Sequence, residues 1–491
     1  MKKNTLPFLS LWISSLLYSN AVVAIETGVK LNDIHSKLNA TQVLKVVKPR
    51  SIAEIQAIIH QARKNGQSIS ISGGQHSMGG QQFGTGTINV NMSEYNKVLS
   101  LDSQRGIVEV ESGIQWPQLI HWLQTHQQGN KYIWAIKQKQ TGADALSIGG
   151  ALSSNVHGRG LNMGPIIYDI EAFTLVDANG KLLFCSRKEH PELFKLVIGG
   201  YGLFGIIATV KIRLAPVVTL QRNVQLVTIN DFIPLVTKRT QEGFTYGDFQ
   251  FAIDADSDAF MNEGIASFYK PVNTELTSNQ AIKELSEKDW SSLLYLAHTD
   301  KTKAFEQYSK FYLTSNGQLY RSDTFQLSVY IDNYHDKFDP NSSEMISEIY
   351  VPRNKLAALF ADLRYDFRKN KVNLIYGTVR LILKDNQSYL PWAKADYASI
   401  VVNFHVDHSP EGIAKAQQDF QLLIDRALHY GGSYFLTYHR WASKDQVLRA
   451  YPQFISFLRL KQKYDPTGVF QSDWYRYYQN LFKKELENEK K

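Results

Sequence analysis

Cysteine is almost missing from this sequence, because Cys185 is the single one among 491 residues. A lone cysteine cannot form a disulfide within its chain, and it excludes zinc and iron–sulfur sites that are built on several cysteines. Cys185 ends the apolar run 182–185. We therefore expect a small buried side chain in a strand.

The sequence also lacks an apolar run long enough to cross a bilayer. The candidate run follows Lys2 and Lys3, extends from Leu6 to Tyr18, and is shorter than the roughly 20 residues that a span requires. Small residues follow at positions 21–24. A charged start, a short apolar middle and a small-residue end predict a signal peptide over residues 1–24, and with it an exported protein that is periplasmic or secreted. The alternative is a membrane anchor, which the short run and its serines disfavour.

Runs of like charge and nucleic-acid motifs are absent as well. The formal net charge is +8 and the pI about 9.1, but the Lys and Arg residues are scattered along the chain. No zinc-finger or RNP signature accompanies them. The sequence thus predicts no nucleic-acid partner, and its positive charge suits an anionic ligand such as a dinucleotide.

Up to about residue 216 the chain shows a regular succession of short strands and helices. Ser51 and Glu54 have the spacing of a capping box, at the start of a helix that we expect to reach Gly66. The other expected elements are strands at 68–72, 87–92, 106–111, 170–176, 181–185 and 206–214 and a helix at 116–125.

From about residue 217 the composition changes. Glycine becomes rarer, and aromatic-rich strands at 249–253 and 325–331 mix with charged helices such as 354–369. This change indicates a second, α+β domain.

A glycine-rich loop, Gly73-Gly74-Gln75-His76-Ser77-Met78-Gly79-Gly80, follows the strand expected at 68–72. Glycines let a backbone approach a phosphate closely and turn several N–H groups toward one point. The loop is neither a Gly-x-Gly-x-x-Gly fingerprint nor a Walker loop, and alone it is more often structural. Two further clusters of small residues, 147–160 and 199–206, favour a ligand, since three such loops suit a long flat molecule with two phosphates in its middle.

Taken in order, these motifs resemble those of the vanillyl-alcohol-oxidase, or PCMH-type, FAD-binding superfamily. The matching stretches are Gly-Gly-Gln-His-Ser (73–77), Ser-Ile-Gly-Gly-Ala-Leu (147–152), His-Gly-Arg-Gly (157–160), Gly-Leu-Phe-Gly-Ile-Ile (202–207) and Asp-Pro-Thr-Gly-Val-Phe-Gln-Ser-Asp (465–473). The resemblance covers residues 46–216 well and the C-terminal segment moderately. Within the superfamily the chain is most similar to sugar, polyol and aldonolactone oxidases and to decaprenylphosphoryl-ribose oxidase.

The resemblance implies a fold and its division. We expect an α+β protein with a two-subdomain PCMH-type FAD-binding domain at 40–216 and a separate α+β cap, or substrate, domain at 217–430. A C-terminal segment at 431–480 is expected to return to the FAD domain and to complete the active site.

The same resemblance implies how FAD is held. In histidyl-flavin relatives the histidine of Gly-Gly-x-His-Ser is bonded to the flavin, so His76 is expected to hold FAD covalently. The alternative is a histidine packed beside a noncovalent flavin. A second covalent bond is not expected, because Cys185 lies outside the second cluster. Val156 falls where relatives control the access of oxygen to the flavin, and a branched side chain there argues for slow reaction with oxygen.

The cofactor contacts that the resemblance implies come from all three clusters and from one glycine before the second. They are His76, Gly73, Gly74, Gln75, Ser77, Met78, Gly79, Gly142, Ser147, Ile148, Gly149, Gly150, Ser154, Asn155, Val156, His157, Gly158 and Ile206.

Oxidation of an alcohol needs a proton acceptor and a fixed cation beside the flavin. Thr378-Val379-Arg380 resembles the Glu-Val-Arg of polyol and aldonolactone oxidases, with Thr378 in place of the acid. Arg380 is therefore a candidate to face substrate and flavin, since an arginine stays charged. An arginine on a strand surface is the alternative.

Other candidate catalytic residues stand in the segment 434–444 and in the second cluster. Tyr438 or His439 is a candidate proton acceptor, and Lys444 is a candidate for orienting the substrate. The alternative for this segment is a polar lid strand. His157 completes the candidate catalytic set.

His405 and His408 have the spacing of a metal-binding pair. No third ligand stands near them in the sequence, so we expect surface histidines and no metal.

The sequence thus predicts an FAD-dependent oxidoreductase that oxidises a hydroxyl group of a sugar, polyol or aldonolactone-like small molecule by hydride transfer to flavin N5. Oxygen or a redox partner would take the electrons from the flavin. Two alternatives stay open, a flavin-dependent reductase of the same fold and a flavin- or carbohydrate-binding protein without turnover. The export signal disfavours the reductase, which needs cytosolic NADPH.

Overall fold

The chain forms three main β-sheets with helices packed around them, a mixed α/β arrangement that agrees with the predicted class. A computed structural model describes residues 25–274, 283–327 and 339–487. The predicted signal peptide lies outside these residues. In the part of the chain that is described, no helix combines the length and the apolarity needed to cross a membrane.

The strands of the first sheet come before and after the glycine-rich loop in the sequence. Its strands, in spatial order, are β1 (Ile25–Leu31), β2 (Thr41–Val47), β4 (Ile88–Asn91) and β3 (Ile69–Ser72). Helix α1 (Ile52–Lys64) packs on it with a buried apolar stripe of Ile55, Ile59 and Ala62. Its first turn begins as predicted, since the Ser51 hydroxyl accepts a hydrogen bond from the Glu54 N–H at 3.2 Å. Strand β3 ends at Ser72, where the loop begins.

The second sheet carries the other two glycine clusters. Its strands, in spatial order, are β5 (Val98–Asp102), β6 (Ile107–Glu111), β10 (Ile206–Arg213), β8 (Ile170–Val176) and β9 (Leu182–Ser186). Around it lie α2 (Trp116–Thr125), α3 (Ile148–Ser154), α4 (Pro191–Val197) and the small strand pair β7 (Trp134–Ala135) and β11 (Ala215–Pro216). Cys185 is fully buried here, and burial raises the pKa of its thiol to about 12, so the expectation of a buried side chain in a strand is confirmed.

The large sheet begins at Thr219, near the change of composition in the sequence. Its strands, in spatial order, are β15 (Leu319–Arg321), β12 (Thr219–Thr228), β14 (Glu263–Val272), β13 (Tyr246–Phe251), β17 (Leu374–Ile382), β18 (Tyr397–Asp407), β16 (Ser342–Pro352) and β19 (Ser433–Tyr434). All its described pairings are antiparallel. Side chains directly opposite one another on such strands share a face.

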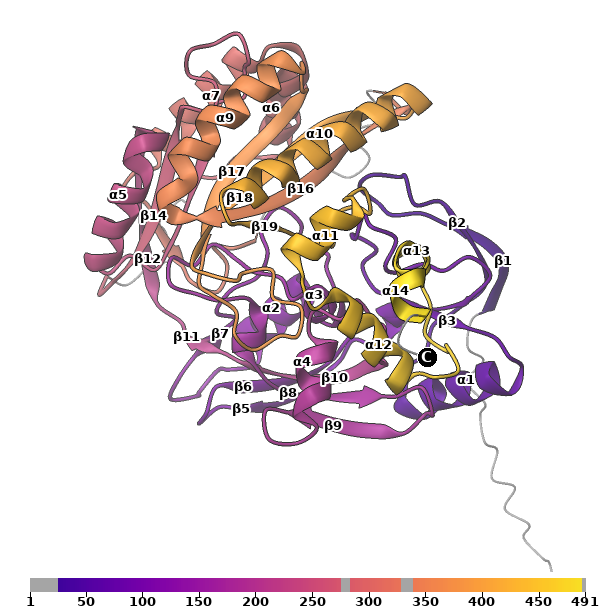
Figure 1. Cartoon of the computed structure of the whole chain (residues 1–491). Helices are drawn as coiled ribbons and strands as arrows, with labels where there is room; N and C mark the ends of the chain where they lie inside the picture. The colour runs from indigo at the N-terminus through magenta and orange to yellow at the C-terminus, as the bar shows by residue number, and fades with distance from the viewer. Residues whose placement is uncertain (1–24, 275–282, 328–338, 488–491) are drawn as a thin grey trace, which may run out of the picture.

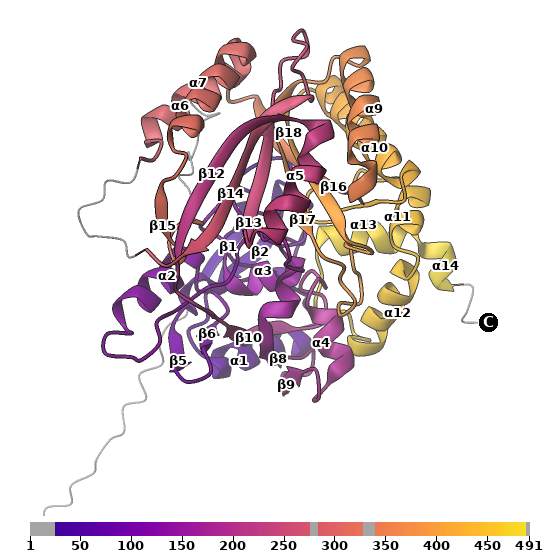
Figure 2. The same cartoon turned by 90° about the vertical axis from the view of Figure 1, so that its left-hand side faces the viewer.

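Helices cover both faces of the large sheet. On one face lie α5 (Ile229–Gln241), α9 (Leu356–Lys369) and α10 (Pro410–His429), and on the other lie α6 (Glu287–Thr299) and α7 (Lys301–Thr314). Figure 1 shows the large sheet and its helices above the two smaller sheets, and Figure 2 shows α6 and α7 on the opposite side from α9 and α10.

The C-terminal helices return to the two smaller sheets (Figure 1). They are α11 (Lys444–Ala450), α12 (Phe454–Tyr464), α13 (Asp473–Leu481) and α14 (Lys483–Glu487), and the chain also contains short 3-10 turns at Met92–Glu94, Ile166–Asp169 and Arg353–Lys355. After α12 the backbone passes along the free edge of β3. The Ile69 N–H donates to the Val469 carbonyl at 2.6 Å, and the Gln471 N–H donates to the Ile69 carbonyl at 2.8 Å.

One predicted strand is wrong in its described part. Residues 325–327 of the run expected at 325–331 form a turn, and the rest of the run lies outside the described residues. Phe325 is nevertheless buried, with its ring 4.8 Å from that of Tyr246 and 5.2 Å from that of Tyr269. Phe325 therefore packs into the core from a turn. The alternation of apolar residues in the sequence does not distinguish such a turn from a strand.

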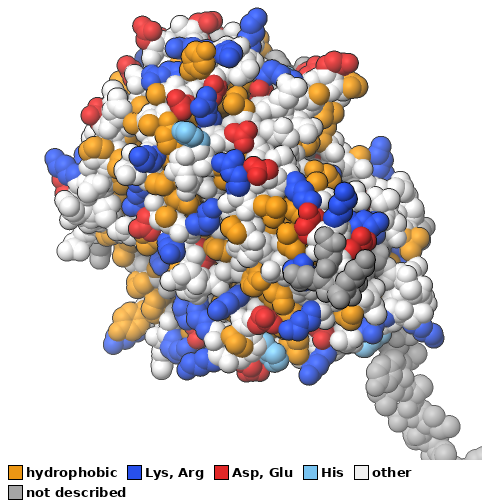
Figure 3. All heavy atoms as spheres, in the orientation of Figure 1, with side chains coloured by type: hydrophobic (Ala, Val, Ile, Leu, Met, Phe, Trp, Pro, Cys, Tyr) orange, Lys and Arg blue, Asp and Glu red, His pale blue; other side chains and the backbone are white. Residues whose placement is uncertain are grey.

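Surface charge is mixed where it can be inspected. On the face shown in Figure 3, Lys and Arg side chains are interspersed with Asp, Glu and apolar side chains. This agrees with the scattered positions of basic residues along the sequence.

Candidate active site

A cavity of about 570 Å³ lies where the three glycine clusters meet the large sheet. It is large enough for a cofactor and a small substrate, since ligand sites commonly measure about 300–1,000 Å³. Most of the predicted site residues line it: Gly73, Gly74, Gln75, His76, Ser77, Met78, Gly142, Ser147, Gly149, Gly150, Ser154, Val156, His157, Arg380 and Tyr438. The structure thus brings together residues that are up to about three-quarters of the chain apart.

Seven predicted residues do not line this cavity: Gly79, Ile148, Asn155, Gly158, Ile206, His439 and Lys444. The side chain of Ile148 is fully buried in the apolar core of the second sheet, and so is that of Ile206 in the core of the first sheet, although the contact expected of Ile206 is through its backbone. Their neighbours Gly149, Gly205 and Ile207 line the cavity instead.

The glycine-rich loop at 73–78 is folded tightly onto the segment 145–147. A Cβ atom added at Gly73 would lie within 3.0 Å of the Ser147 hydroxyl, and one at Gly74 within 3.0 Å of the Ala145 carbonyl. These two glycines are therefore required for contact between chain segments rather than for access to a phosphate. Gln75 has a left-handed backbone with φ of 59°, a strained conformation for a residue with a side chain.

Gly142 is the glycine that opens space for a ligand. It lines the cavity with φ of +91°, and a Cβ atom built on it would meet no protein atom within 4 Å. The cavity wall also contains buried polar atoms without hydrogen-bond partners in the part of the chain that is described, namely Gln81 Oε1, Gln82 Oε1 and Ser112 Oγ. Such atoms are costly unless a ligand or water pairs with them. A polar, elongated cofactor such as FAD fits this cavity.

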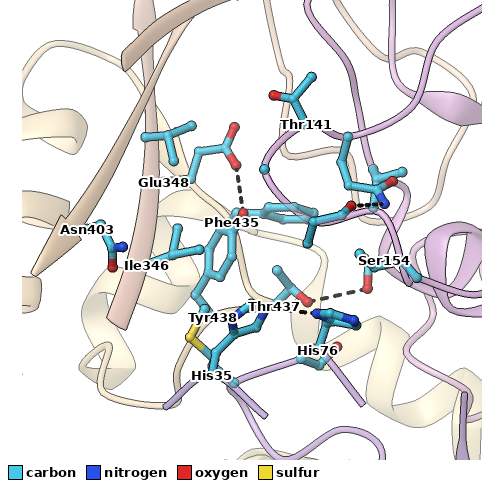
Figure 4. A pocket seen from close by; sticks show the side chains of 18 of the residues that line it. His35, His76, Thr141, Ser154, Ile346, Glu348, Asn403, Phe435, Thr437 and Tyr438 are labelled. Atoms are coloured by element: carbon cyan, nitrogen blue, oxygen red, sulfur yellow. Dashed lines mark hydrogen bonds between the residues drawn. The ribbon is translucent and has the colours of Figure 1, made fainter. Parts of the chain in front are cut away.

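His76 has a histidine partner that the sequence did not reveal. Its Nδ1 is hydrogen bonded to Nε2 of His35 at 2.8 Å (Figure 4). Burial lowers the pKa of His35 to about 4, although Glu344 raises it, so His35 is neutral at pH 7. His76 lines the cavity, and the hydrogen bond to His35 helps to orient its ring there.

Asn155 and Ser154 hold the second cluster in place in different ways. Asn155 ends α3 with a left-handed backbone, donates to the Asp385 carboxylate at 2.9 Å and accepts from the Ile167 N–H at 3.2 Å. Its side chain is therefore committed to the protein, and its expected role as a cofactor ligand is wrong. Ser154 does line the cavity, where its hydroxyl lies 3.3 Å from that of Thr437 (Figure 4).

The polar centre of the cavity is Glu348 on β16, which the sequence analysis missed. One of its oxygens, Oε1, is 2.5 Å from His157 Nε2 and accepts a hydrogen bond from the Ser399 hydroxyl, also at 2.5 Å. The other, Oε2, accepts a longer bond of 3.3 Å from the Tyr438 hydroxyl (Figure 4). The sequence does contain a sign of this site, because two acidic residues four positions apart, Glu344 and Glu348, lie on the same face of a strand that is otherwise largely buried.

The charge state of this centre follows from its neighbours. Burial by itself raises the pKa of Glu348, but the charge and hydrogen bond of His157, with help from Ser399 and Arg380, outweigh burial and lower that pKa. The carboxylate is therefore ionised at neutral pH. His157 Nδ1 faces the Gly158 carbonyl at 2.8 Å, which can only accept. Both ring nitrogens of His157 are therefore engaged in hydrogen bonds within the protein.

Arg380 lies on the same face of the large sheet as Glu348. Its side chain is 8% exposed, lines the cavity, and has an Nε atom without a hydrogen-bond partner among the described residues. The interpretation of Arg380 as a strand-surface arginine is therefore wrong. Its guanidinium is placed to meet an anionic or polar ligand.

Thr378 and Glu348 occupy the same level of the sheet. Both residues pair with Val401 of β18, so the three form one row across β17, β18 and β16. Thr378 itself is fully buried and donates its hydroxyl to the Phe249 carbonyl at 3.2 Å. Where the resemblance leads us to expect an acid, this chain has a threonine, and it carries a carboxylate two strands away in the same row.

The surroundings of Tyr438 and His439 contradict their predicted role as proton acceptors. Burial, followed by the charge of Glu348, raises the pKa of Tyr438 well above its ordinary value despite Arg380, so the phenol stays protonated. It lines the cavity as a hydrogen-bond donor rather than as a base. His439 packs away from the cavity, with its ring 4.4 Å from that of Phe420, and burial lowers its pKa to about 3.

Lys444 is not part of the site. Its ammonium forms an ion pair with Glu485 and lies 5.5 Å from the centre of the Phe482 ring, at the start of α11. It joins two C-terminal helices, and its expected role in orienting the substrate is wrong.

Comparisons with known proteins agree with this geometry. A family model described as an FAD binding domain matches residues 43–186, and one described as D-arabinono-1,4-lactone oxidase matches residues 272–478. The L-gulonolactone oxidase of Bos taurus is 24% identical over 438 residues, which cover 86% of this chain and 92% of that protein. The D-arabinono-1,4-lactone oxidase of Yarrowia lipolytica is 30% identical over 190 residues, which cover 38% of this chain and 35% of that protein.

The glycine loops, the cavity and these matches together define the chain as a member of the PCMH-type FAD-binding oxidoreductase superfamily. Within that superfamily it is similar to aldonolactone oxidases, over residues 272–478 in the family model and at 24% identity over most of its length, and it is an FAD-linked oxidoreductase.

The position of His439 predicts a pH dependence of stability. The pKa of its ring is lowered from 6.5 to about 3 in the folded chain, so between pH 7 and pH 5 the unfolded chain gains a proton that the folded chain does not. The stabilisation is complete above pH 6.5 and is lost as the pH falls, by about 2 kcal/mol at pH 5. We expect His439→Phe to show a smaller fall of Tm between pH 7 and pH 5 than the unsubstituted protein.

The control is His121→Phe, at an exposed position of α2. It should keep the full pH dependence. An unchanged fall of Tm in His439→Phe would contradict the assignment of a buried neutral ring.

Proposed function

We propose that this chain oxidises a hydroxyl group of an aldonolactone-type substrate and passes the electrons to FAD. The observation that carries the proposal is Glu348, an ionised and buried carboxylate in the cavity that the glycine clusters also line. The names of the relatives, L-gulonolactone oxidase and D-arabinono-1,4-lactone oxidase, support an aldonolactone as the substrate class.

We assign the first and second sheets to the two parts of an FAD-binding domain and the large sheet to the substrate cap. The glycine clusters all belong to the first two sheets, and Glu348 and Arg380 belong to the large one. FAD, when bound, supplies the acceptor for the hydride that leaves the substrate carbon. Oxygen or a redox partner then takes the electrons.

The chain's own residues bind and deprotonate the hydroxyl. Oε1 of Glu348 is saturated by two bonds of 2.5 Å, whereas Oε2 has one bond of 3.3 Å. Oε2 is therefore the atom that accepts a hydrogen bond from the substrate hydroxyl and then its proton. The ring of His157, hydrogen bonded to Oε1, keeps the carboxylate oriented.

Arg380 and Tyr438 complete the binding wall. The guanidinium supplies a permanent positive charge beside the place where charge changes during the reaction. The Tyr438 phenol, which stays protonated, donates a hydrogen bond to Glu348 or to a substrate oxygen.

Glu348→Gln tests this assignment. The amide cannot take a proton, so we expect kcat to fall by roughly 10²–10⁴-fold, the usual contribution of a positioned base. The measurement is anaerobic mixing of the flavin-loaded protein with a panel of aldono-1,4-lactones, sugars and polyols, followed by the bleaching of the visible flavin absorbance. Glu263→Gln is the matched control, because Glu263 lies on the same sheet outside the cavity.

The control should bleach at the original rate, and both variants should keep their flavin. A flavin that no member of the panel reduces would contradict the proposed function itself. Equal rates in Glu348→Gln and the unsubstituted protein would contradict the role of Glu348 alone.

We further propose that FAD is bonded covalently to the imidazole of His76. The position of His76 in the cavity wall, within the glycine-rich loop, supports this assignment. In acid-denatured protein, yellow colour and flavin fluorescence should stay with the precipitate. In His76→Ala they should pass to the supernatant, and in His121→Ala they should remain. Release of all colour from the unsubstituted protein would overturn the covalent bond but not the binding of FAD.

Export is proposed on the sequence alone. The basic start, apolar run and small residues at 2–24 favour cleavage after Ala24. N-terminal sequencing of protein recovered from the periplasm or the medium should begin at Ile25. A Leu11→Arg change in the apolar run should retain the protein in the cytoplasm. Recovery of the unsubstituted protein in the cytoplasm with Met1 intact would argue against export.

A further inference from the structure

A second group of polar side chains lies on the cavity face of the large sheet, outside the site around Glu348. His298 comes from the last turn of α6, Glu344 from β16 and His405 from β18. One ligand atom from each of the three lies within 4.8 Å of the other two. The sequence analysis considered His405 with His408 alone; the structure places a half-buried His405 beside His298 and Glu344, which come from distant parts of the chain.

The backbone itself places two of the three residues together. Glu344 and His405 are directly opposite each other in the antiparallel pairing of β16 with β18, so their side chains leave the sheet on the same face. His298 reaches them from the helix above. Its Nε2 is 2.7 Å from Glu344 Oε1, and its ring centre is 5.2 Å from that of His405. Two of these side chains are largely shielded from solvent, with 5% of His298 and 13% of Glu344 exposed.

The electrostatic surroundings favour a cation. The carboxylates of Asp339 and Asp407 both interact with His405, in addition to Glu344 on the opposite strand. Glu344 is the carboxylate within the group, and Asp339 and Asp407 add negative charge from its solvent side. Imidazole nitrogens with negative charge around them suit a divalent ion.

The donor set matches a first-row divalent metal. Two imidazole nitrogens and one carboxylate oxygen are ligands that Zn²⁺ prefers, at about 2.0–2.2 Å, and three protein ligands leave a fourth position open. Ligand atoms around such an ion stand roughly 3.3–3.5 Å apart. The 2.7 Å contact between His298 and Glu344 has to open by less than 1 Å, which a rotation of the glutamate side chain provides.

The group borders the cavity through Glu344. Glu344 lines the cavity, and so does Asn403, two residues before His405 on the same face of β18. The Asn403 Oδ1 atom is buried and has no hydrogen-bond partner in the described chain. Figure 4 shows Asn403 on the strand side of the cavity, next to Ile346.

From this geometry we propose that His298, Glu344 and His405 bind a divalent metal ion of the zinc type. The ion ties α6 to β16 and β18. Because α6 and α7 together contribute Leu293, Ala297, Phe305 and Tyr308 to the cavity wall, the ion fixes that wall against the sheet. Its three ligands differ from Glu348 and from the residues of the glycine clusters, although Glu344 lines the same cavity, so the metal site does not depend on the identity of the substrate.

The test uses the full-length protein without an affinity tag, dialysed against a weak chelator and then titrated with Zn²⁺. We expect about one zinc per chain by mass spectrometry of the metal, and a rise in Tm on adding zinc that EDTA reverses. Loss of a residue outside the ligand set typically weakens metal binding by roughly 10–100-fold. We expect a larger loss of zinc affinity in each of the ligand variants His298→Asn, Glu344→Gln and His405→Asn. In each variant the zinc-dependent rise in Tm should disappear.

His408→Asn is the matched control. His408 lies three residues from His405, and its Nε2 is 2.9 Å from the Ser343 hydroxyl. This variant should keep its zinc, and its loss of zinc would contradict the assigned ligand set. Absence of zinc from the unsubstituted protein, with no effect of zinc on Tm, would overturn the metal site and leave a hydrogen-bonded His298–Glu344 pair. Neither result bears on the oxidation of a lactone, which is measured separately.

Discussion

The buried pair of His157 and Glu348 is the interaction on which the site depends. It joins the second glycine cluster, which belongs to the small sheets, to the middle of the large sheet. Both side chains are about 3% exposed, so the Glu348 carboxylate has no water to stabilise its charge. Loss of His157 would leave that carboxylate buried without its main partner, a change that commonly costs about 3–5 kcal/mol. The pair therefore holds the two halves of the cavity together.

The acid of this site illustrates that position on a sheet can matter more than position in the chain. Thr378 stands where related oxidases carry an acid, and Glu348 lies two strands away in the same row. Across antiparallel strands, residues in one row face the same side and are separated by only about 5 Å per strand. A carboxylate can thus reach the same region of a cavity from β16 or from β17. A comparison of local motifs alone finds the threonine at position 378 and concludes that the acid has been lost.

The part of the site that could be predicted is the part encoded locally. Gly73 to Met78 and Ser147 to Gly150 carry a pattern of small residues that identifies the cofactor, and Ser51 with Glu54 marks the first helix. Glu348, His35 and His298 carry no such pattern, since their partners are brought to them by pairing between distant strands and by packing of helices. His439 and Lys444 were misassigned for the same reason: their chemistry suits catalysis, but tertiary packing turns one into an apolar cluster and the other toward Glu485.

The edge of the first sheet has a consequence for how the protein is made. Strand β3 leads directly into the cofactor loop, and its outer edge is completed by residues 469–471, which a ribosome adds long after the loop has emerged. Until then, the N–H and carbonyl of Ile69 have no strand beside them, and the loop has no fixed base. The base of the cofactor loop is therefore completed by one of the last parts of the chain to be made.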